Sequence, residues 1–174
     1  MLKKLPELID PVVFADRESH VVGGLDISCL SRLTDTLFST EGQLDVDLQF
    51  YRDAQVPKIE GSIKGNLKLI CQSCLGAMDM AINKSVKIGM IKSMEQADRF
   101  EEGLEPLLVT GEKIALAEIV EDEILIDLPD YPRHGDSCEY YQKSEAFVES
   151  KRITQEEPAN PFAVLAQLKK SGDQ

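Results

Sequence analysis

Two cysteines spaced as Cys-x-x-Cys, Cys71 and Cys74, are the residues of this chain best suited to chemistry. Such a pair can be a redox couple, a metal knuckle or simple packing. A thioredoxin-type couple needs a strand-to-helix junction, where the helix N-terminus lowers the thiol pKa. Here apolar residues alternate over 59–69 and over 78–90, which predicts a β-hairpin with the cysteines in its turn. The redox interpretation is therefore weak, and a turn of this kind suits a zinc knuckle.

A closed tetrahedral zinc site needs two further ligands. His134 and Cys138 are the candidates, because they lie four residues apart in a loop rich in Pro and Gly. Thiolates and imidazoles are ligands that zinc prefers. The alternative, to which the sequence gives the same weight, is that these side chains pack without binding a metal. The sequence therefore leaves two outcomes open: a Zn²⁺ site built from Cys71, Cys74, His134 and Cys138, or no cofactor. Cys29 is expected in the core.

The predicted hairpin is an island of positive charge in an acidic chain. The formal net charge is −12, yet residues 56–92 hold six lysines against two acidic residues. Alternation places Lys64, Lys68 and Lys87 together on the solvent face, which could meet phosphate groups or an acidic protein. The candidate RNA-binding residues are Lys58, Lys64, Lys68, Lys84, Lys87 and Lys92. A merely soluble outer face explains the same pattern equally well.

Acidic residues dominate the segment after the hairpin. Residues 93–157 carry eighteen acidic against six basic residues, and 113–128 has the apolar spacing of an amphipathic helix that ends at Pro129. Consecutive helical side chains point about 100° apart, so its carboxylates do not converge into a catalytic metal site. A solvated face is the default, and a docking surface for a basic partner is the functional alternative. The candidate docking residues are Glu118, Glu121 and Asp122, with Phe162, Leu165 and Leu168 of a short C-terminal helix.

The order of elements predicts an α+β fold, with an antiparallel sheet of about five strands covered by helices. Short extended pieces are expected over 11–27, a helix over 28–38 and a strand from Gly42 onward. One α+β domain is predicted for 1–138, a polar and flexible segment for 139–159, and a helix for 160–170, with Asn160 as N-cap and a proline after it.

Composition narrows the class of protein. No run of about 18 apolar residues is present, which argues against a membrane span, and the first ten residues lack the apolar region of a secretory signal. Four cysteines without an export signal indicate a reducing compartment, so we expect a cytoplasmic protein. No nucleophile elbow, phosphate-cradling Gly loop or Ser/His/Asp arrangement is found, and an enzyme is not expected.

Several of these segments together resemble one known family. They are Asp10-Pro11, the Cys71–Cys74 turn, the acidic stretch 117–129, the His/Cys loop and the ending 160–170. In this order they are similar to the bacterial YceD family, the large ribosomal RNA subunit accumulation proteins, over nearly the full length. Relatives often carry a second cysteine pair where this chain has His134 and Cys138, and an arginine where it has Ser73.

The resemblance implies a cytoplasmic, non-enzymatic factor that supports synthesis, processing or stability of the large-subunit (23S) ribosomal RNA. Together with the charge pattern, it leads to the hypothesis that the lysine face meets pre-ribosomal RNA or a large-subunit precursor, while the acidic helix and tail meet a basic ribosomal protein or a processing nuclease. The alternative is a protein–protein adaptor that docks through its acidic and C-terminal helices without touching RNA.

Overall fold

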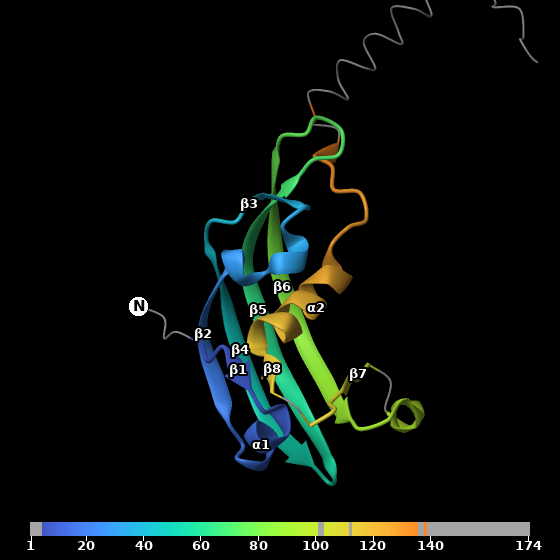
Figure 1. Ribbon diagram of the computed structural model, residues 1–174. Coiled ribbons are helices and arrows are strands. Elements are labelled where there is room, and N and C mark those ends of the chain that lie inside the picture. The colour runs from blue at the N-terminus through green and yellow to red at the C-terminus, as the bar shows by residue number, and fades with distance from the viewer. Residues whose placement is uncertain (1–4, 101–102, 112, 136–137, 139–174) are drawn as a thin grey trace, which may run out of the picture. The chain divides into compact units, whose positions relative to one another are not determined.

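A long, curved β-sheet with helices on one face makes up the first part of the chain (Figure 1). The computed structural model describes residues 5–100, 103–111, 113–135 and 138, and the chain forms two compact units, Met1–Arg133 and His134–Gln174. The strands of the first unit are β1 (Leu8–Ile9), β2 (His20–Asp26), β3 (Leu37–Ser39), β4 (Gln43–Asp53), β5 (Val56–Ile70), β6 (Ala77–Ile91), β7 (Glu105–Leu108) and β8 (Ile114–Ala115). Its helices are α1 (Pro11–Asp16) and α2 (Leu116–Asp127), with 3₁₀ helices η1 (Ile27–Cys29), η2 (Ser31–Leu33) and η3 (Met94–Arg99).

The main sheet has six strands in the described part of this unit. Its order is β2-β4-β5-β6-β7, with β3 pairing with β5 as well, and a separate two-stranded sheet joins β1 to β8. All pairs are antiparallel except β6–β7, which is parallel. The sequence predicted an antiparallel sheet of about five strands; the structure has six strands in this sheet, and it is mixed, because β7 pairs parallel with β6. Neither α-helix is long and apolar enough to cross a membrane.

Period-two alternation places the core on the face that α2 covers. Leu44, Val46, Leu48 and Phe50 of β4 are buried, as are Ile59, Ile63, Leu67 and Leu69 of β5. The intervening residues of both strands face outward. In β6 the alternation stops at Ile88, and residues 88–91 are all buried. At Gly89 the side chains of Phe100 and Leu104 lie close against the strand. The predicted hairpin is confirmed: β5 and β6 pair antiparallel, from Lys58 opposite Gly89 to Ile70 opposite Ala77.

The expectation of extended pieces over 11–27 is wrong for the first of them. Residues 11–16 form α1, because Asp10 caps the helix by accepting a hydrogen bond from Val13 N at 3.1 Å and Pro11 occupies the first turn. An Asp-Pro pair is a signal for a helix start, since the side chain supplies the N-cap and the proline ring presets φ. The β-branched Val12 and Val13 that follow favour a strand, which is why the sequence predicted an extended segment here. β2 then runs through Gly23 and Gly24 without a break.

The helix expected over 28–38 is also wrong. The segment forms η1, η2 and the strand β3. Leu30 and Leu33 are buried as an amphipathic helix would require, but a spacing of three is equally one turn of a 3₁₀ helix. Ser31, Thr34 and Asp35 favour local turns over α-helix, and the Thr34 hydroxyl donates to Ser31 O at 2.8 Å. Cys29 is exposed, which corrects its expected place in the core.

The acidic helix is confirmed as α2, three residues shorter at its start than predicted because Ile114 and Ala115 pair with β1. Leu116, Ile119, Val120 and Ile124 form its buried stripe. The predicted polar segment 139–159 and helix 160–170, with Phe162, Leu165 and Leu168, lie outside the described residues and stay predictions.

Candidate metal centre and nucleic-acid interface

A tight turn between β5 and β6 holds the two knuckle cysteines. Cys71 N donates to Gly76 O at 2.9 Å, and Leu75 N donates to Cys71 O at 2.8 Å. Leu75 adopts a left-handed φ of 59°, which lets the chain reverse inside six residues. Cys71 is buried and Cys74 is exposed. Both side chains therefore belong to a turn whose backbone geometry is set by the hairpin itself.

Within the first unit, the segment that follows α2 is hydrogen-bonded to this turn. Gln72 N donates to Pro132 O at 2.8 Å. His134 comes two residues after Pro132, so its Cα lies within about 7.6 Å of the Pro132 Cα. In the second unit, Cys138 N donates to Gly135 O at 3.1 Å, a bond that closes one short turn. The residue bonded to the knuckle turn, Pro132, is thus two positions before the predicted third ligand in the sequence.

The four predicted ligands form a candidate metal site. The ligand atoms of Cys71, Cys74, His134 and Cys138 all lie within 4.8 Å of one another. Thiolates bound to zinc at about 2.3 Å in tetrahedral geometry stand about 3.8 Å apart, so this spacing fits zinc. Three sulfurs and one imidazole make a closed set of four, which is typical of structural rather than catalytic zinc.

The six candidate lysines do not share one surface. Lys64 and Lys68 of β5 and Lys87 of β6 are exposed on the outer face of the sheet, as alternation predicted. Lys92 is exposed just beyond the end of β6. Lys58 Nζ lies 2.6 Å from Asp53 Oδ2. Lys84 belongs to the opposite face, because even positions of β6 point toward the core, and its side chain is only 15% exposed.

Acidic residues stand directly across the ladder from each of the three outer lysines. Lys64 pairs in register with Asp45, Lys68 with Asp79 and Lys87 with Glu60. Lys64 and Lys68 are four residues apart on one strand, or about 13 Å. The outer face is therefore a mixed lattice of charges rather than a dense basic patch. The sequence could not show this, because charge counts along a chain carry no information on strand register.

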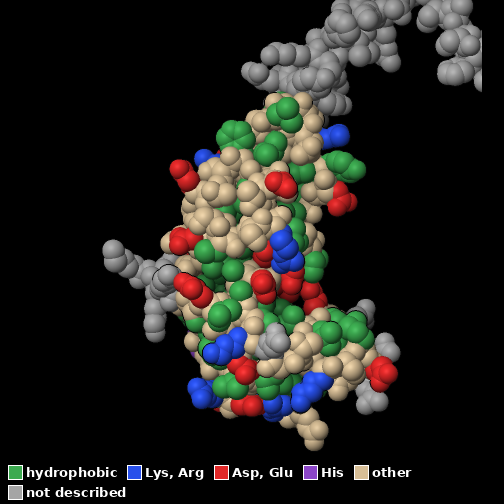
Figure 2. All heavy atoms as spheres, in the orientation of Figure 1, with side chains coloured by type: hydrophobic (Ala, Val, Ile, Leu, Met, Phe, Trp, Pro, Cys, Tyr) green, Lys and Arg blue, Asp and Glu red, His purple; other side chains and the backbone are tan. Residues whose placement is uncertain are grey.

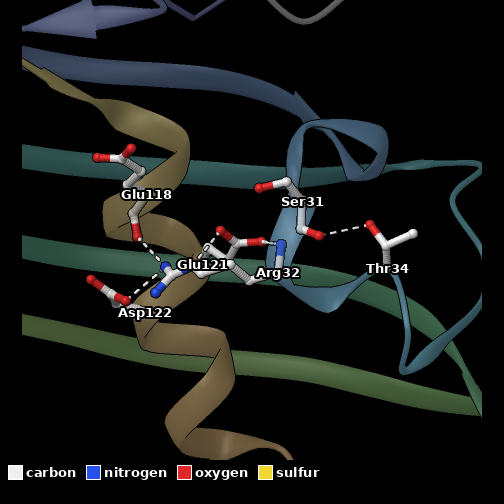
Figure 3. A network of polar contacts seen from close by, with 6 residues as sticks. All are labelled: Ser31, Arg32, Thr34, Glu118, Glu121 and Asp122. Carbon is white, nitrogen blue, oxygen red and sulfur yellow. Dashed lines mark hydrogen bonds and ion pairs between the residues drawn. The ribbon is translucent and has the colours of Figure 1, made fainter.

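Two of the three acidic residues predicted for docking, Glu121 and Asp122, form ion pairs with Arg32 (Figure 3). Glu121 is buried, accepts from Arg32 N at 2.7 Å and accepts from Arg32 Nε at 2.8 Å. Asp122 Oδ1 lies 2.7 Å from Arg32 Nη2 and is about half exposed. The carboxyl of Glu118 is exposed, and its backbone carbonyl accepts from Arg32 Nη2 at 3.4 Å. Hydrogen bonds from Arg32 to Glu121 and then Asp122 raise the pKa of this guanidinium.

A further acidic residue of α2, Glu123, was missed by the sequence reasoning. It is buried, and burial together with the neighbouring Glu105 raises its pKa to about 7, while Lys84 acts in the opposite direction. The signal was present, since position 123 continues the buried spacing of Leu116, Ile119 and Val120. A carboxylate on the buried stripe of a helix needs either a cationic partner or a bound proton.

Comparison with known proteins identifies a family model and a curated relative that match this chain. The family model described as "Large ribosomal RNA subunit accumulation protein YceD" matches residues 59–169. A curated protein of that name from Haemophilus influenzae is 32% identical over 170 residues, which cover 95% of this chain and 97% of the relative. No solved structure matches the chain significantly. The match spans the hairpin, the knuckle, α2 and the His/Cys loop, and the chain therefore belongs to the YceD family of large ribosomal RNA subunit accumulation proteins.

Proposed function

We propose that this protein supports the accumulation of large-subunit ribosomal RNA in the cytoplasm, as a binding factor that catalyses no reaction. The observation that carries the proposal is the full-length similarity to a curated relative named for this role. The closed set of candidate zinc ligands supports a non-enzymatic factor, because it leaves no open coordination position for a substrate. The partner in this proposal is pre-ribosomal RNA or a precursor of the large subunit.

The RNA contact in this proposal is made by Lys64, Lys68 and Lys87 on the outer face of the β5–β6 hairpin. These ammonium groups are exposed, and none of the ion pairs among the described residues involves them. The acids across the ladder weaken the local field, so contact with phosphate is expected to be modest in strength and strongly dependent on salt. Lys58 and Lys84, which already have carboxylate partners, are not part of this surface.

Co-sedimentation with large-subunit precursors tests this contact. The double variant Lys64→Gln/Lys68→Gln should reduce the fraction of protein found with the precursor. Arg17→Gln/Lys113→Gln is the matched control, because it removes the same charge from two exposed positions away from the outer face of the hairpin. Equal association of the two double variants would overturn the lysine surface and leave the family role standing.

We also infer that Cys71, Cys74, His134 and Cys138 bind one Zn²⁺ as a structural ion. The bound ion would tie the hairpin turn to the loop after α2 and deprotonate the thiols. Elemental analysis of the purified protein should find about one zinc per chain. If protein purified in the absence of chelators contains no zinc, the metal site is ruled out, and the four side chains contribute only packing.

A protein–protein adaptor is the second candidate function. Acidic side chains gather over α2 (Figure 2), and Leu125 and Ile126 of this helix are exposed, which favours a basic and partly apolar partner. Deletion of residues 158–174 separates the two functions. An adaptor that uses its C-terminal segment loses its partner, whereas an RNA-binding factor retains its RNA.

A further inference from the structure

A small cavity lies between the second half of α2 and the strands β6 and β7. Its volume is about 290 Å³. The wall is apolar and includes Ile88, Leu107, Ile119 and Ile126. The ionisable groups that line it are Glu105, Asp122 and Glu123, and all three are carboxylic acids. A cavity whose walls are apolar and whose ionisable groups are all carboxylic acids favours a ligand with an apolar stem and a cationic end.

Glu123 is the buried carboxylic acid of this cavity, and one of its two oxygens has no hydrogen-bond partner among the described residues. Its side chain is 3% exposed, and its Oε2 accepts no hydrogen bond from the described residues. Lys84 Nζ approaches Oε2 only to 3.5 Å, and the same ammonium group lies 3.7 Å from Glu105 Oε1. One lysine therefore serves two carboxylates. A buried carboxylate with an unmet acceptor oxygen is a ready partner for an additional donor.

Asp122, the third carboxylic acid of the cavity, brings no additional cation to Glu105 and Glu123. Asp122 is paired with Arg32, which lies 2.7 Å away. Arg32 Nε donates to Glu121, so both Nε and Nη2 of this guanidinium already bind residues of α2 (Figure 3). The cavity thus holds more negative than positive charge within bonding distance, even though α2 as a whole is anchored by an arginine.

We propose that this cavity receives the arginine side chain of a basic segment of a partner protein. The methylene stem would lie along the apolar wall while the planar guanidinium donates to Glu123 and Glu105 together. Exposed apolar residues at the rim, Leu125 and Ile126, would pack on the neighbours of that arginine. RNA is disfavoured here, because a polyanion would approach three carboxylic acids.

The titration of Glu123 adds a signature that a merely structural carboxylate would lack. The groups that face it are Glu105 of β7, Lys84 of β6 and Asp122 of its own helix. With a pKa raised to about 7, Glu123 is largely protonated at pH 6 and largely ionised at pH 8. The guanidinium binds the ionised form, so affinity should rise over this interval.

Two synthetic peptides provide the test. One is fluorescein-labelled Gly-Leu-Arg-Leu-Arg-Leu-amide, and the other carries citrulline, the uncharged isostere, in place of both arginines. At pH 8 the arginine peptide should bind the full-length protein about tenfold more tightly than the citrulline peptide. Glu123→Gln or Glu105→Gln should remove most of this preference, and Glu123→Gln should also abolish the rise in affinity between pH 6 and pH 8.

Glu118→Gln is the matched control, since it removes one charge from an exposed position of the same helix. It should leave both the preference and the pH dependence unchanged. Ile126→Ser should weaken both peptides by removing rim contact. Equal binding of the two peptides, or an equal loss in Glu118→Gln and Glu123→Gln, would overturn the proposal and reduce the interaction to general attraction by an acidic protein. Neither result bears on the lysine surface of the hairpin, which is tested with RNA.

Discussion

Arg32 and Glu121 form a two-point contact that joins segments 89 residues apart in the chain. The backbone N–H of Arg32 donates to one carboxylate oxygen at 2.7 Å, and the side-chain Nε donates to the other at 2.8 Å (Figure 3). The carboxylate is 3% exposed and the guanidinium 47% exposed. One buried acid therefore fixes η2 against α2 through main chain and side chain at once.

Glu121→Gln should destabilise the protein. An amide keeps one acceptor oxygen but turns an N–H₂ group toward a donor, which breaks a buried charge-assisted bond. The expected loss is about 2 kcal/mol in the free energy of unfolding, measured by urea denaturation. Glu118→Gln, on the exposed part of the same helix, should change this energy by less than about 0.5 kcal/mol. Equal effects of the two substitutions would show that the Arg32 contact does not contribute to stability.

Glu123 should make the protein less stable as the pH rises. Its pKa is raised from 4.5 to about 7 in the folded state, so the folded state holds this proton more tightly than the unfolded state. Stability is therefore lost between about pH 4.5 and pH 7, by roughly 3 kcal/mol. Glu123→Gln should flatten this part of the profile and be the more stable protein at pH 8. Parallel profiles of the two proteins in urea denaturation between pH 5 and pH 8 would contradict the prediction.

Removal of one knuckle thiol should release the proposed zinc. Cys74→Ser tests this with little disturbance of packing, because Cys74 is exposed whereas Cys71 is buried. The zinc content should fall from about one ion per chain to near zero, and the thermal transition should move to lower temperature. Cys29→Ser, at an exposed cysteine outside the ligand set, should retain the metal. Unchanged zinc in Cys74→Ser would show that the ion is held elsewhere.

Neutralising the acids beside the outer lysines should strengthen RNA binding. Asp45 and Asp79 stand in register with Lys64 and Lys68, so Asp45→Asn/Asp79→Asn removes a neighbouring negative charge beside each ammonium group. The affinity for large-subunit RNA should rise about threefold, since exposed pairs contribute less than about 1 kcal/mol each.

A matched double variant separates local from general charge effects. Asp35→Asn/Asp130→Asn changes the net charge equally at exposed positions elsewhere and should have a much smaller effect. The slope of log affinity against log salt should lie near −2 to −3 for contacts from about three lysines. A steeper slope would mean that further cations take part.

Much of the hairpin could be predicted from the sequence, because its strands and turn depend on residues that are close together in the chain. Alternation of apolar and polar residues at Ile59, Ile63 and Leu67 determines which face is buried, and the Cys71–Cys74 turn lies between two such runs. The Asp10-Pro11 helix start is an equally local signal, but the β-branched Val12 and Val13 beside it favour an extended chain. Leu30 and Leu33 were ambiguous in principle, because one spacing serves two kinds of helix.

The strands and turn of the hairpin, the buried stripe of α2 and the four ligand types of the candidate metal site could all be predicted from the sequence, since each depends on residue type and short spacing. Which charges are neighbours could be learned from the folded chain alone. Lys64 faces Asp45, Lys84 turns inward to Glu105 and Glu123, and Arg32 reaches Glu121. The physical reason is that electrostatic energy depends on distance in space and on burial, and strand register and helix placement set both.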